Sequence, residues 1–198
     1  MKRRTTFVVT ALAVLAGASA AGAQQKATAV DTHCRPQAKV AGRASPYDST
    51  AIALAGATGR ICYSRPSLRG RTMIGGERVP YGKVWRTGAN EPTTIHLPVA
   101  ASIAGVRVPA GSYSLYTIPD PKAWTVIVNR STAQWGIEAD YPSVQAQEVG
   151  RGKVVAQALK APVETFTIRA TPVGSAGSDL VLEWQNTRIV VPVRVVKS

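Results

Sequence analysis

Apolar and polar residues alternate most regularly in the C-terminal third of the chain. Three segments show a period of two: "VETFTIRAT" (163–171), "DLVLEW" (179–184) and "RIVVPVRVV" (188–196). Because successive side chains of a strand point to opposite faces, this pattern predicts a three-strand antiparallel meander with one apolar face. The segments "VGSAGS" and "QNT" are its expected turns. Pro192 lacks a backbone N–H, so the last strand is expected to be an edge strand or to carry a bulge.

Shorter β-prone runs fill the middle of the chain, from residue 92 to residue 129. Ala104-Gly105 suits a tight hairpin between "ASI" and "VRV", and Pro109-Ala110-Gly111 forms the next turn. The run "AWTVIVN" (123–129) is apolar on both faces, which is typical of a central strand. The segment "SPYDSTAIALAGATGRICYS" is expected to hold one or two further strands, with a turn at its glycines.

No stretch has a long period of 3.6 residues, and only "ADYPSVQAQEVG" suggests a short helix. Many short strands separated by Gly and Pro are typical of an all-β sandwich or barrel. We therefore expect an all-β, antiparallel β-sandwich, with a barrel-like arrangement as the alternative. It would form a single domain over residues 46–198.

Residues 1–23 have the three parts of a signal peptide. A basic start (Lys2, Arg3, Arg4) precedes the apolar run "FVVTALAVLA" and the small-residue site "AGA", which ends at Ala23. A membrane anchor is the alternative, but the apolar run is short for about 30 Å of hydrocarbon. The pattern predicts a periplasmic or secreted protein that does not span the membrane. Residues 24–45 lack periodicity and are expected to be a flexible N-terminal segment.

The 198-residue chain is strongly basic, with a formal net charge of +13. Without the three basic residues of the leader, 21 of the 24 Lys and Arg residues remain against 11 Asp and Glu, a net charge of +10. Such an excess can simply keep the protein soluble, which is the favoured interpretation. The alternative is an acidic partner, such as a small anionic ligand or an acidic component of the cell envelope. The sequence has no zinc-finger spacing and no basic strand interleaved with aromatic residues, so we do not expect nucleic acid as a partner. The oligomeric state does not follow from these data.

The two cysteines, Cys34 and Cys62, are expected to form a disulfide in an oxidising compartment. The alternative is a zinc site that adds His33 and His96. Structural zinc uses this ligand set, but usually as closely spaced pairs. The neighbouring His33 and Cys34 would point to opposite sides of an extended chain. We therefore expect neither a metal ion nor another cofactor.

Arginine is concentrated between residues 60 and 86. The basic residues there are Arg60, Arg65, Arg69, Arg71, Arg78, Lys83 and Arg86, with Glu77 as the one acidic residue. The planar arginine fork binds carboxylate or phosphate with two hydrogen bonds. Glycines in the same stretch allow backbone N–H groups to approach a ligand. The region is therefore a candidate anion site.

The motifs "YSRPSLRGR", "VPYGKVWRTGANEPTTI", "PAGSYSLYTIP", "WTVIVN", "QWG" and "ETFTI" occur in this order. From Tyr63 to Val195 the chain resembles a bacterial family known only as domain of unknown function 2911. The resemblance implies a secreted β-sandwich module and brings no established activity. The chain departs from the family pattern after the "QWG" motif, where Tyr141, Glu148 and Arg151 are kept with glycines between them.

Three functions are compatible with the sequence, and the first is favoured. The protein binds a small anionic or polar ligand, or a partner surface; it is a hydrolase-like enzyme that uses Glu91 and Arg86; or it is a structural module. In the third case Arg86 and Glu91 form an internal ion pair, Asn90 bonds a turn and Trp85 fills the core. No catalytic residue is assigned. The candidate ligand-binding residues are Tyr63, Arg65, Arg71, Trp85, Arg86, Asn90, Glu91 and Trp135.

Overall fold

The computed structural model of the protein describes residues 29–136 and 138–196. The predicted signal peptide, residues 1–23, lies outside the described residues, as does the first part of the segment 24–45. No helix in the described part of the chain is long and apolar enough to cross a membrane.

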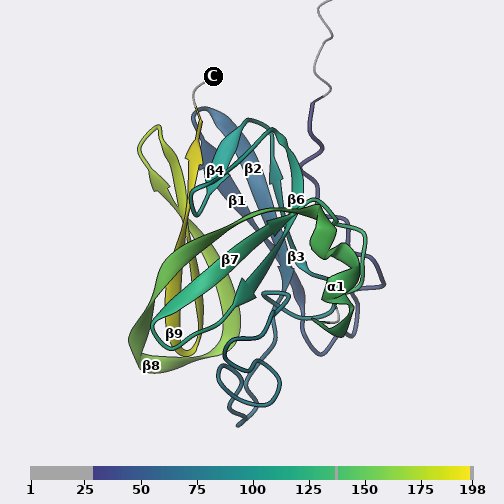
Figure 1. The fold of residues 1–198 in the computed structure, drawn as a ribbon, viewed down its shortest axis with the longest axis vertical. Helices are drawn as coiled ribbons and strands as arrows, with labels where there is room; N and C mark the ends of the chain where they lie inside the picture. Colours follow the sequence, from purple (N-terminus) through teal and green to yellow (C-terminus); the bar gives the residue numbers. More distant parts are fainter. Residues whose placement is uncertain (1–28, 137, 197–198) are drawn as a thin grey trace, which may run out of the picture.

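Strands dominate the described residues (Figure 1). They are β1 (Tyr47–Leu54), β2 (Ala57–Ser64), β3 (Thr93–Leu97), β4 (Ala101–Ile103), β5 (Val106–Val108), β6 (Gly111–Ile118), β7 (Ala123–Asn129), β8 (Glu148–Val173) and β9 (Gly177–Val195). One short helical segment comprises η1 (Glu138–Asp140), α1 (Tyr141–Val144) and η2 (Gln145–Gln147), where the sequence suggested a helix. The loop of residues 65–92 joins β2 to β3 and extends below the sheet in Figure 1.

All strands belong to one antiparallel sheet in the order β1-β2-β3-β6-β7-β8-β9-β4-β5. The two outer strands of this order, β1 and β5, do not pair with each other, so the sheet is not closed. The predicted hairpin at Ala104-Gly105 joins β4 to β5, and both residues have a positive φ. Strand β7 pairs with β6 and β8, which confirms its prediction as a central strand.

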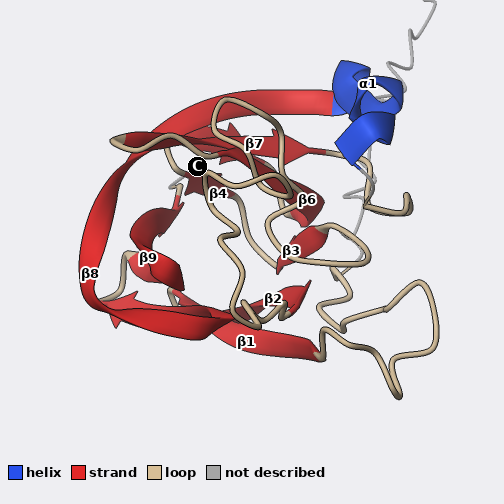
Figure 2. Cartoon of the chain, turned by 90° about the horizontal axis from the view of Figure 1, so that it is seen from below, coloured by secondary structure: helices blue, strands red, loops and turns tan. Residues whose placement is uncertain are grey.

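The 26-residue strand β8 connects two layers of the molecule. One layer contains β1, β2, β3, β6 and β7, and the other contains β9, β4 and β5. The first part of β8 pairs with β7 and its second part with β9, with register shifts between Ala158 and Thr167. Such shifts bend a strand, and Figure 2 shows β8 curving around one side of the molecule. The second part returns against the opposite layer, where Thr50 Oγ1 donates to the Ile168 carbonyl at 2.7 Å. The prediction of an all-β, antiparallel, single-domain fold is confirmed, and the layers share β8.

The predicted C-terminal meander differs in two details. The segment "QNT" does not form a turn, because β9 continues through it with Gln185 at φ 52°. Strand β9 is also not an edge strand, since it lies between β8 and β4. Pro192 is tolerated because it lies just past the last β4–β9 pair, Ile103 with Val193, so no ladder bond from its nitrogen is needed. Its carbonyl still accepts a hydrogen bond from Ala104 N at 2.9 Å.

Aromatic rings form the centre of the main hydrophobic core. Trp85 stacks on Trp184 with ring centroids 5.5 Å apart, and Phe166 and Trp124 meet Trp85 edge to face. The predicted alternation of β8 and β9 is confirmed, because Phe166, Ile168, Leu180, Leu182, Trp184, Ile189, Val191 and Val193 are all buried. A second, smaller cluster forms where Tyr141 of α1 packs on Tyr116.

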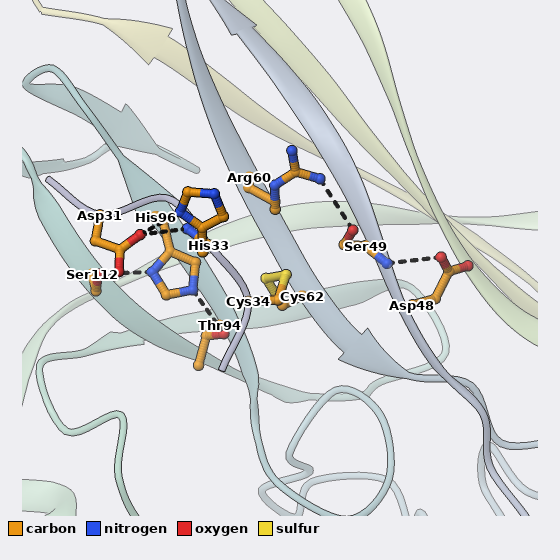
Figure 3. The surroundings of a disulfide bond; sticks show 10 residues. All are labelled: Asp31, His33, Cys34, Asp48, Ser49, Arg60, Cys62, Thr94, His96 and Ser112. Carbon is orange, nitrogen blue, oxygen red and sulfur yellow. Dashed lines mark hydrogen bonds and ion pairs between the residues drawn. A yellow bond between two sulfur atoms is a disulfide. The ribbon is translucent and has the colours of Figure 1, made fainter. Parts of the chain in front are cut away.

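Cys34 and Cys62 form the predicted disulfide, which attaches the N-terminal segment to β2 (Figure 3). The two Cα atoms are 5.7 Å apart, and 28 residues separate them in the sequence. Both thiols are therefore used in this bond, so the alternative zinc site that needs both cysteines is not formed. No group of three or more His, Cys, Asp or Glu side chains within residues 29–136 and 138–196 is placed to hold a metal ion.

Replacing both cysteines by alanine is expected to lower the free energy of unfolding by about 3–4 kcal/mol, because the unfolded chain regains the entropy that the cross-link removed. Urea unfolding at neutral pH measures this loss. Dithiothreitol should destabilise the wild type and leave the double variant unchanged. A double variant as stable as the oxidised wild type would contradict the prediction.

Candidate functional site

The stretch "VPYGKVWRTGANEPTTI" enters the core at Trp85. The backbone of Trp85 pairs with Thr117 of β6 through hydrogen bonds of 2.7 and 2.8 Å. This pairing directs the indole inward, where it is 3 % exposed and donates from Nε1 to the Gly88 carbonyl at 3.1 Å. Trp85 therefore fills the core, as the structural alternative expected, and a small part of it also lines a cavity described below.

The polar residues after Trp85 bond the loop to itself and to neighbouring strands. Thr87 and Asn90 both have a positive φ, 57° and 63°. Thr93 Oγ1 donates to the Thr87 carbonyl at 2.6 Å, and Asn90 Nδ2 donates to Ser64 Oγ at 3.1 Å. A side-chain amide is suited to stabilise such a turn. Asn90 thus has a turn backbone, and its amide ties the loop to β2, so structural hydrogen bonds explain this part of the motif.

Arg86 pairs with Glu138 and not with Glu91, the partner that the structural alternative gave it. Its Nε donates to Glu138 Oε1 at 2.8 Å and its second terminal nitrogen, Nη2, to Oε2 at 3.0 Å. The remaining terminal nitrogen, Nη1, donates to the Asn90 carbonyl at 3.1 Å. Gly136 packs against this group, and a Cβ there would collide with the Asn90 carbonyl and lie 2.7 Å from Arg86 Cδ. The glycine of the "QWG" motif therefore allows the Arg86 side chain to lie where it does.

Glu91 forms a buried ion pair with Arg43 of the N-terminal segment. Arg43 Nη1 lies 3.0 and 2.9 Å from the two carboxylate oxygens, and the side chains are 9 % and 4 % exposed. Arg43 also donates to the carbonyls of Ala38 and Lys39. Burial, with the Glu91 charge nearby, raises the pKa of the adjacent Tyr47 to about 12. Glu91 thus holds the N-terminal segment against the domain.

A cavity of about 490 Å³ lies beside Trp85 and Arg86. Its apolar lining comes from Pro66, Met73, Val79, Trp85 and Trp184, and its charged lining from Arg71, Glu77, Arg78, Arg86 and Glu138. The loop of residues 65–92 supplies most of these residues, and Trp184 comes from β9. The cavity thus combines an apolar floor with three guanidinium groups and two carboxylates.

The guanidinium groups at this cavity differ in how many of their N–H donors already have a hydrogen-bond partner. Arg71 donates from Nε to the Leu68 carbonyl at 2.8 Å and from one terminal nitrogen to the Ser67 carbonyl at 2.9 Å. Arg78 is exposed and has no hydrogen-bond or ion-pair partner among the residues that the structure describes. Arg78, and to a lesser degree Arg71, therefore retain N–H donors for a ligand.

One glutamine holds the outer wall of the cavity in place. Gln185 Oε1 accepts from the backbone N–H groups of Met73 and Ile74 at 2.8 and 3.1 Å, and its Nε2 donates to the Ile74 carbonyl at 3.3 Å. The positive φ of Gln185 belongs to the segment for which the sequence predicted a turn. The segment that carries Arg71, Glu77 and Arg78 is thus attached directly to β9.

The cavity brings together three of the eight residues expected at the site: Arg71, Trp85 and Arg86. The sequence prediction left out Glu77, Arg78, Glu138 and Trp184. Arg78 belongs to the arginine-rich stretch, so the local composition already pointed to it. Trp184 was recognised as a core residue of a strand, but nothing near it in the sequence indicates that it reaches this loop.

The other expected site residues lie elsewhere. Tyr63 is buried, and its hydroxyl accepts from Ile168 N at 2.9 Å; burial raises the pKa of this hydroxyl. Arg65 pairs with Asp48 at 3.2 Å and donates to the Phe166 carbonyl. Trp135 is 40 % exposed on the surface. Together with Asn90 and Glu91, these residues do not line the cavity.

A second cavity, of about 250 Å³, lies between the N-terminal segment and strands β3 and β6. Figure 3 shows His33 and His96 close to each other beside the disulfide. His96 Nδ1 lies 2.7 Å from Ser112 Oγ and its Nε2 lies 3.3 Å from Thr94 Oγ1, while burial lowers the pKa of its imidazole. Asp31 contacts His33 and Arg35, and among the described residues it makes no hydrogen bond to His96. The groups therefore do not form a Ser–His–Asp arrangement.

The residues at which the sequence departs from the family pattern also meet in the structure. Tyr141 donates to Glu148 Oε1 at 2.6 Å, and Arg151 Nε donates to Glu148 Oε2 at 2.7 Å. The Arg151 hydrogen bond holds the pKa of the Glu148 carboxyl below its usual range, whereas burial raises the pKa of Tyr141. These three residues anchor α1 to the start of β8.

Residues 45–193 match the model of a family described as "Protein of unknown function (DUF2911)". No curated protein and no solved structure matches the chain. The matched residues include the loop of residues 65–92 and every strand that contributes to the main core.

Proposed function

The chain belongs to this family of proteins of unknown function, DUF2911, and we propose that it binds a small anionic ligand in the 490 Å³ cavity beside Trp85 and Arg86. Arg71, Arg78 and Arg86 would contact the anionic groups, and Trp85, Trp184 and Val79 the apolar part of the ligand.

The observation that carries this proposal is the guanidinium of Arg78, which lines the cavity and has no partner among the described residues. An exposed arginine needs no acidic partner to be stable in water, so its N–H donors are available to a ligand. Arginine is the residue best suited to bind a planar anion with two hydrogen bonds. The accessible lining of the cavity is mainly polar, which suits an anionic ligand.

The roles of Tyr63, Arg65, Asn90, Glu91 and Trp135 are revised in this proposal. The first four bond other parts of the protein and serve to fix the loop and its surroundings. Trp135 lies on the surface and is given no role in the site. The hydrolase-like alternative required Glu91 beside a substrate, and the buried ion pair of Glu91 with Arg43 lends it no support. We therefore propose binding without catalysis.

We also propose that the protein works outside the cytoplasm, in the periplasm or in the medium. The disulfide between Cys34 and Cys62 supports this, because such bonds persist in oxidising compartments. The basic and apolar pattern of residues 1–23 supports it independently.

Replacing Arg78 by alanine is expected to weaken the binding of citrate at least tenfold, because an exposed donor at the cavity is lost while its surroundings stay intact. Isothermal titration at low ionic strength measures the effect. Arg107→Ala is the matched control, since it also removes an exposed positive charge but lies on β5, outside the cavity. Equal affinities of the two variants would mean that citrate responds only to net charge. Absence of citrate and inorganic phosphate binding to the wild type would contradict the proposed function.

A further inference from the structure

The carboxylate of Glu138 occupies the fork of Arg86 at the cavity. Besides the two charge-assisted hydrogen bonds to the guanidinium, of 2.8 and 3.0 Å, the backbone N–H of Arg86 points to Glu138 Oε1 at 3.3 Å. Three N–H groups of Arg86 thus donate to the carboxylate of Glu138. This arrangement shows which ligand chemistry fits Arg86, because a carboxylate already binds there.

The Arg86–Glu138 pair is much more accessible than the Arg43–Glu91 pair. Its side chains are 23 % and 29 % exposed, compared with 9 % and 4 % for Arg43 and Glu91. Ion pairs that water reaches contribute little net stability, because water competes for both partners. A dissolved carboxylate can therefore compete for Arg86, whereas it cannot reach Arg43.

Displacing Glu138 requires only a rotation of its side chain. The helical segment that follows is held by other contacts: Tyr141 packs on Tyr116 with ring centroids 4.6 Å apart, and Asn129 Nδ2 donates to the Val144 carbonyl at 2.8 Å. Glu138 itself is at the start of this segment and is only partly buried. Its carboxylate can move into water while α1 stays in place.

We propose that the ligand is a small dicarboxylate, one carboxylate of which replaces that of Glu138 in the fork of Arg86. This inference rests on the proposed function, and it names the ligand class and the residue that competes with it. The second carboxylate would contact Arg78 and the remaining N–H groups of Arg71. Glu138 then acts as an internal competitor that lowers the affinity of the empty site and excludes neutral compounds.

Replacing Glu138 by glutamine tests the competition directly. Glu138→Gln is expected to bind glutarate at least tenfold more tightly than the wild type, because a neutral amide competes poorly for Arg86. Glu77→Gln is the matched control: it also removes one negative charge from the cavity lining, and Glu77 has no partner among the described residues. The affinity of Glu77→Gln for glutarate should exceed that of the wild type by only about twofold. Inorganic phosphate should gain about equally, and by about twofold, in both variants.

Hydrogen exchange provides a second measurement on the wild-type protein. Glutarate should leave the exchange of the backbone amides in residues 138–147 unchanged, because only the Glu138 side chain moves. Equal gains in the two glutamine variants, or faster exchange in residues 141–147, would overturn the displacement and leave the proposed function standing. A larger gain for phosphate than for glutarate would overturn the ligand class. If neither probe binds to any variant, the proposed function fails and this inference fails with it.

Discussion

Replacing Arg43 by methionine is expected to lower the free energy of unfolding by about 3–5 kcal/mol, because it leaves a buried carboxylate without its charged partner. Glu91 is 4 % exposed, and Arg43 supplies the hydrogen bonds to both of its oxygens. Methionine retains much of the arginine's apolar volume, so the loss reflects the missing charge and hydrogen bonds more than a cavity. Urea unfolding at pH 7 measures the change.

Two controls separate this effect from a general effect of losing an arginine. In the double variant Arg43→Met/Glu91→Leu no charge is left buried, so much of the lost stability should return. Arg35→Met breaks an exposed pair with Asp31, in which the side chains are 81 % and 42 % exposed. That change should cost less than about 1 kcal/mol. If Arg43→Met were as mild as Arg35→Met, the buried pair would not be what holds the N-terminal segment.

Trp184→Ala is expected to cost about 3–5 kcal/mol, the usual cost of removing a large aromatic side chain from a core. Trp184 is 1 % exposed, stacks on Trp85 and meets Phe166 at a centroid distance of 5.9 Å. Its Nε1 also donates to the Glu164 carbonyl at 3.2 Å. The substitution therefore removes packing and one of the two hydrogen bonds that the Glu164 carbonyl accepts; the bond from Leu68 N at 2.9 Å remains. Thermal and urea unfolding of the purified variant measure the loss.

Trp135→Ala is the matched control for this prediction, because it removes the same side chain from a position that is 40 % exposed. Its effect should stay below about 1 kcal/mol. Trp184→Phe should lie between the two, since it keeps an aromatic ring but loses the hydrogen bond. Similar losses for Trp184→Ala and Trp135→Ala would show that the stacked pair is not central to the core.

The strands of the C-terminal half show what a local sequence pattern can predict and where it fails. The alternation in residues 163–196 correctly identified the buried face, including Phe166, Leu182 and Trp184. The pattern failed at the segment "QNT", where polar residues suggested a turn and β9 continues instead. There Gln185 bonds the distant loop at Met73 and Ile74, so a contact outside the strand accounts for the polar residue.

For the candidate site, the sequence identified the arginine-rich loop but not the partners of its residues. Arg86 and Glu91 are close in the sequence, and the structural alternative paired them with each other. The structure pairs Arg86 with Glu138 and Glu91 with Arg43. With many arginines and few acidic residues in the chain, proximity in the sequence cannot select the partner. The selection depends on the path of residues 29–45 and on Gly136, which leaves space for Arg86.

The sequence by itself determined the fold class, the buried face of most strands, the disulfide and the family. Each of these depends on the period of the side chains, on the presence of two cysteines or on contiguous motifs, all of which are local properties of the chain. Only the tertiary structure decided which charges are neutralised and which guanidinium remains available at the cavity. That outcome depends on contacts between residues about 50 to 110 positions apart, such as Arg86 with Glu138 and Gln185 with Met73. The folded sheet brings these residues together, and no local pattern in the sequence indicates which distant residues will meet.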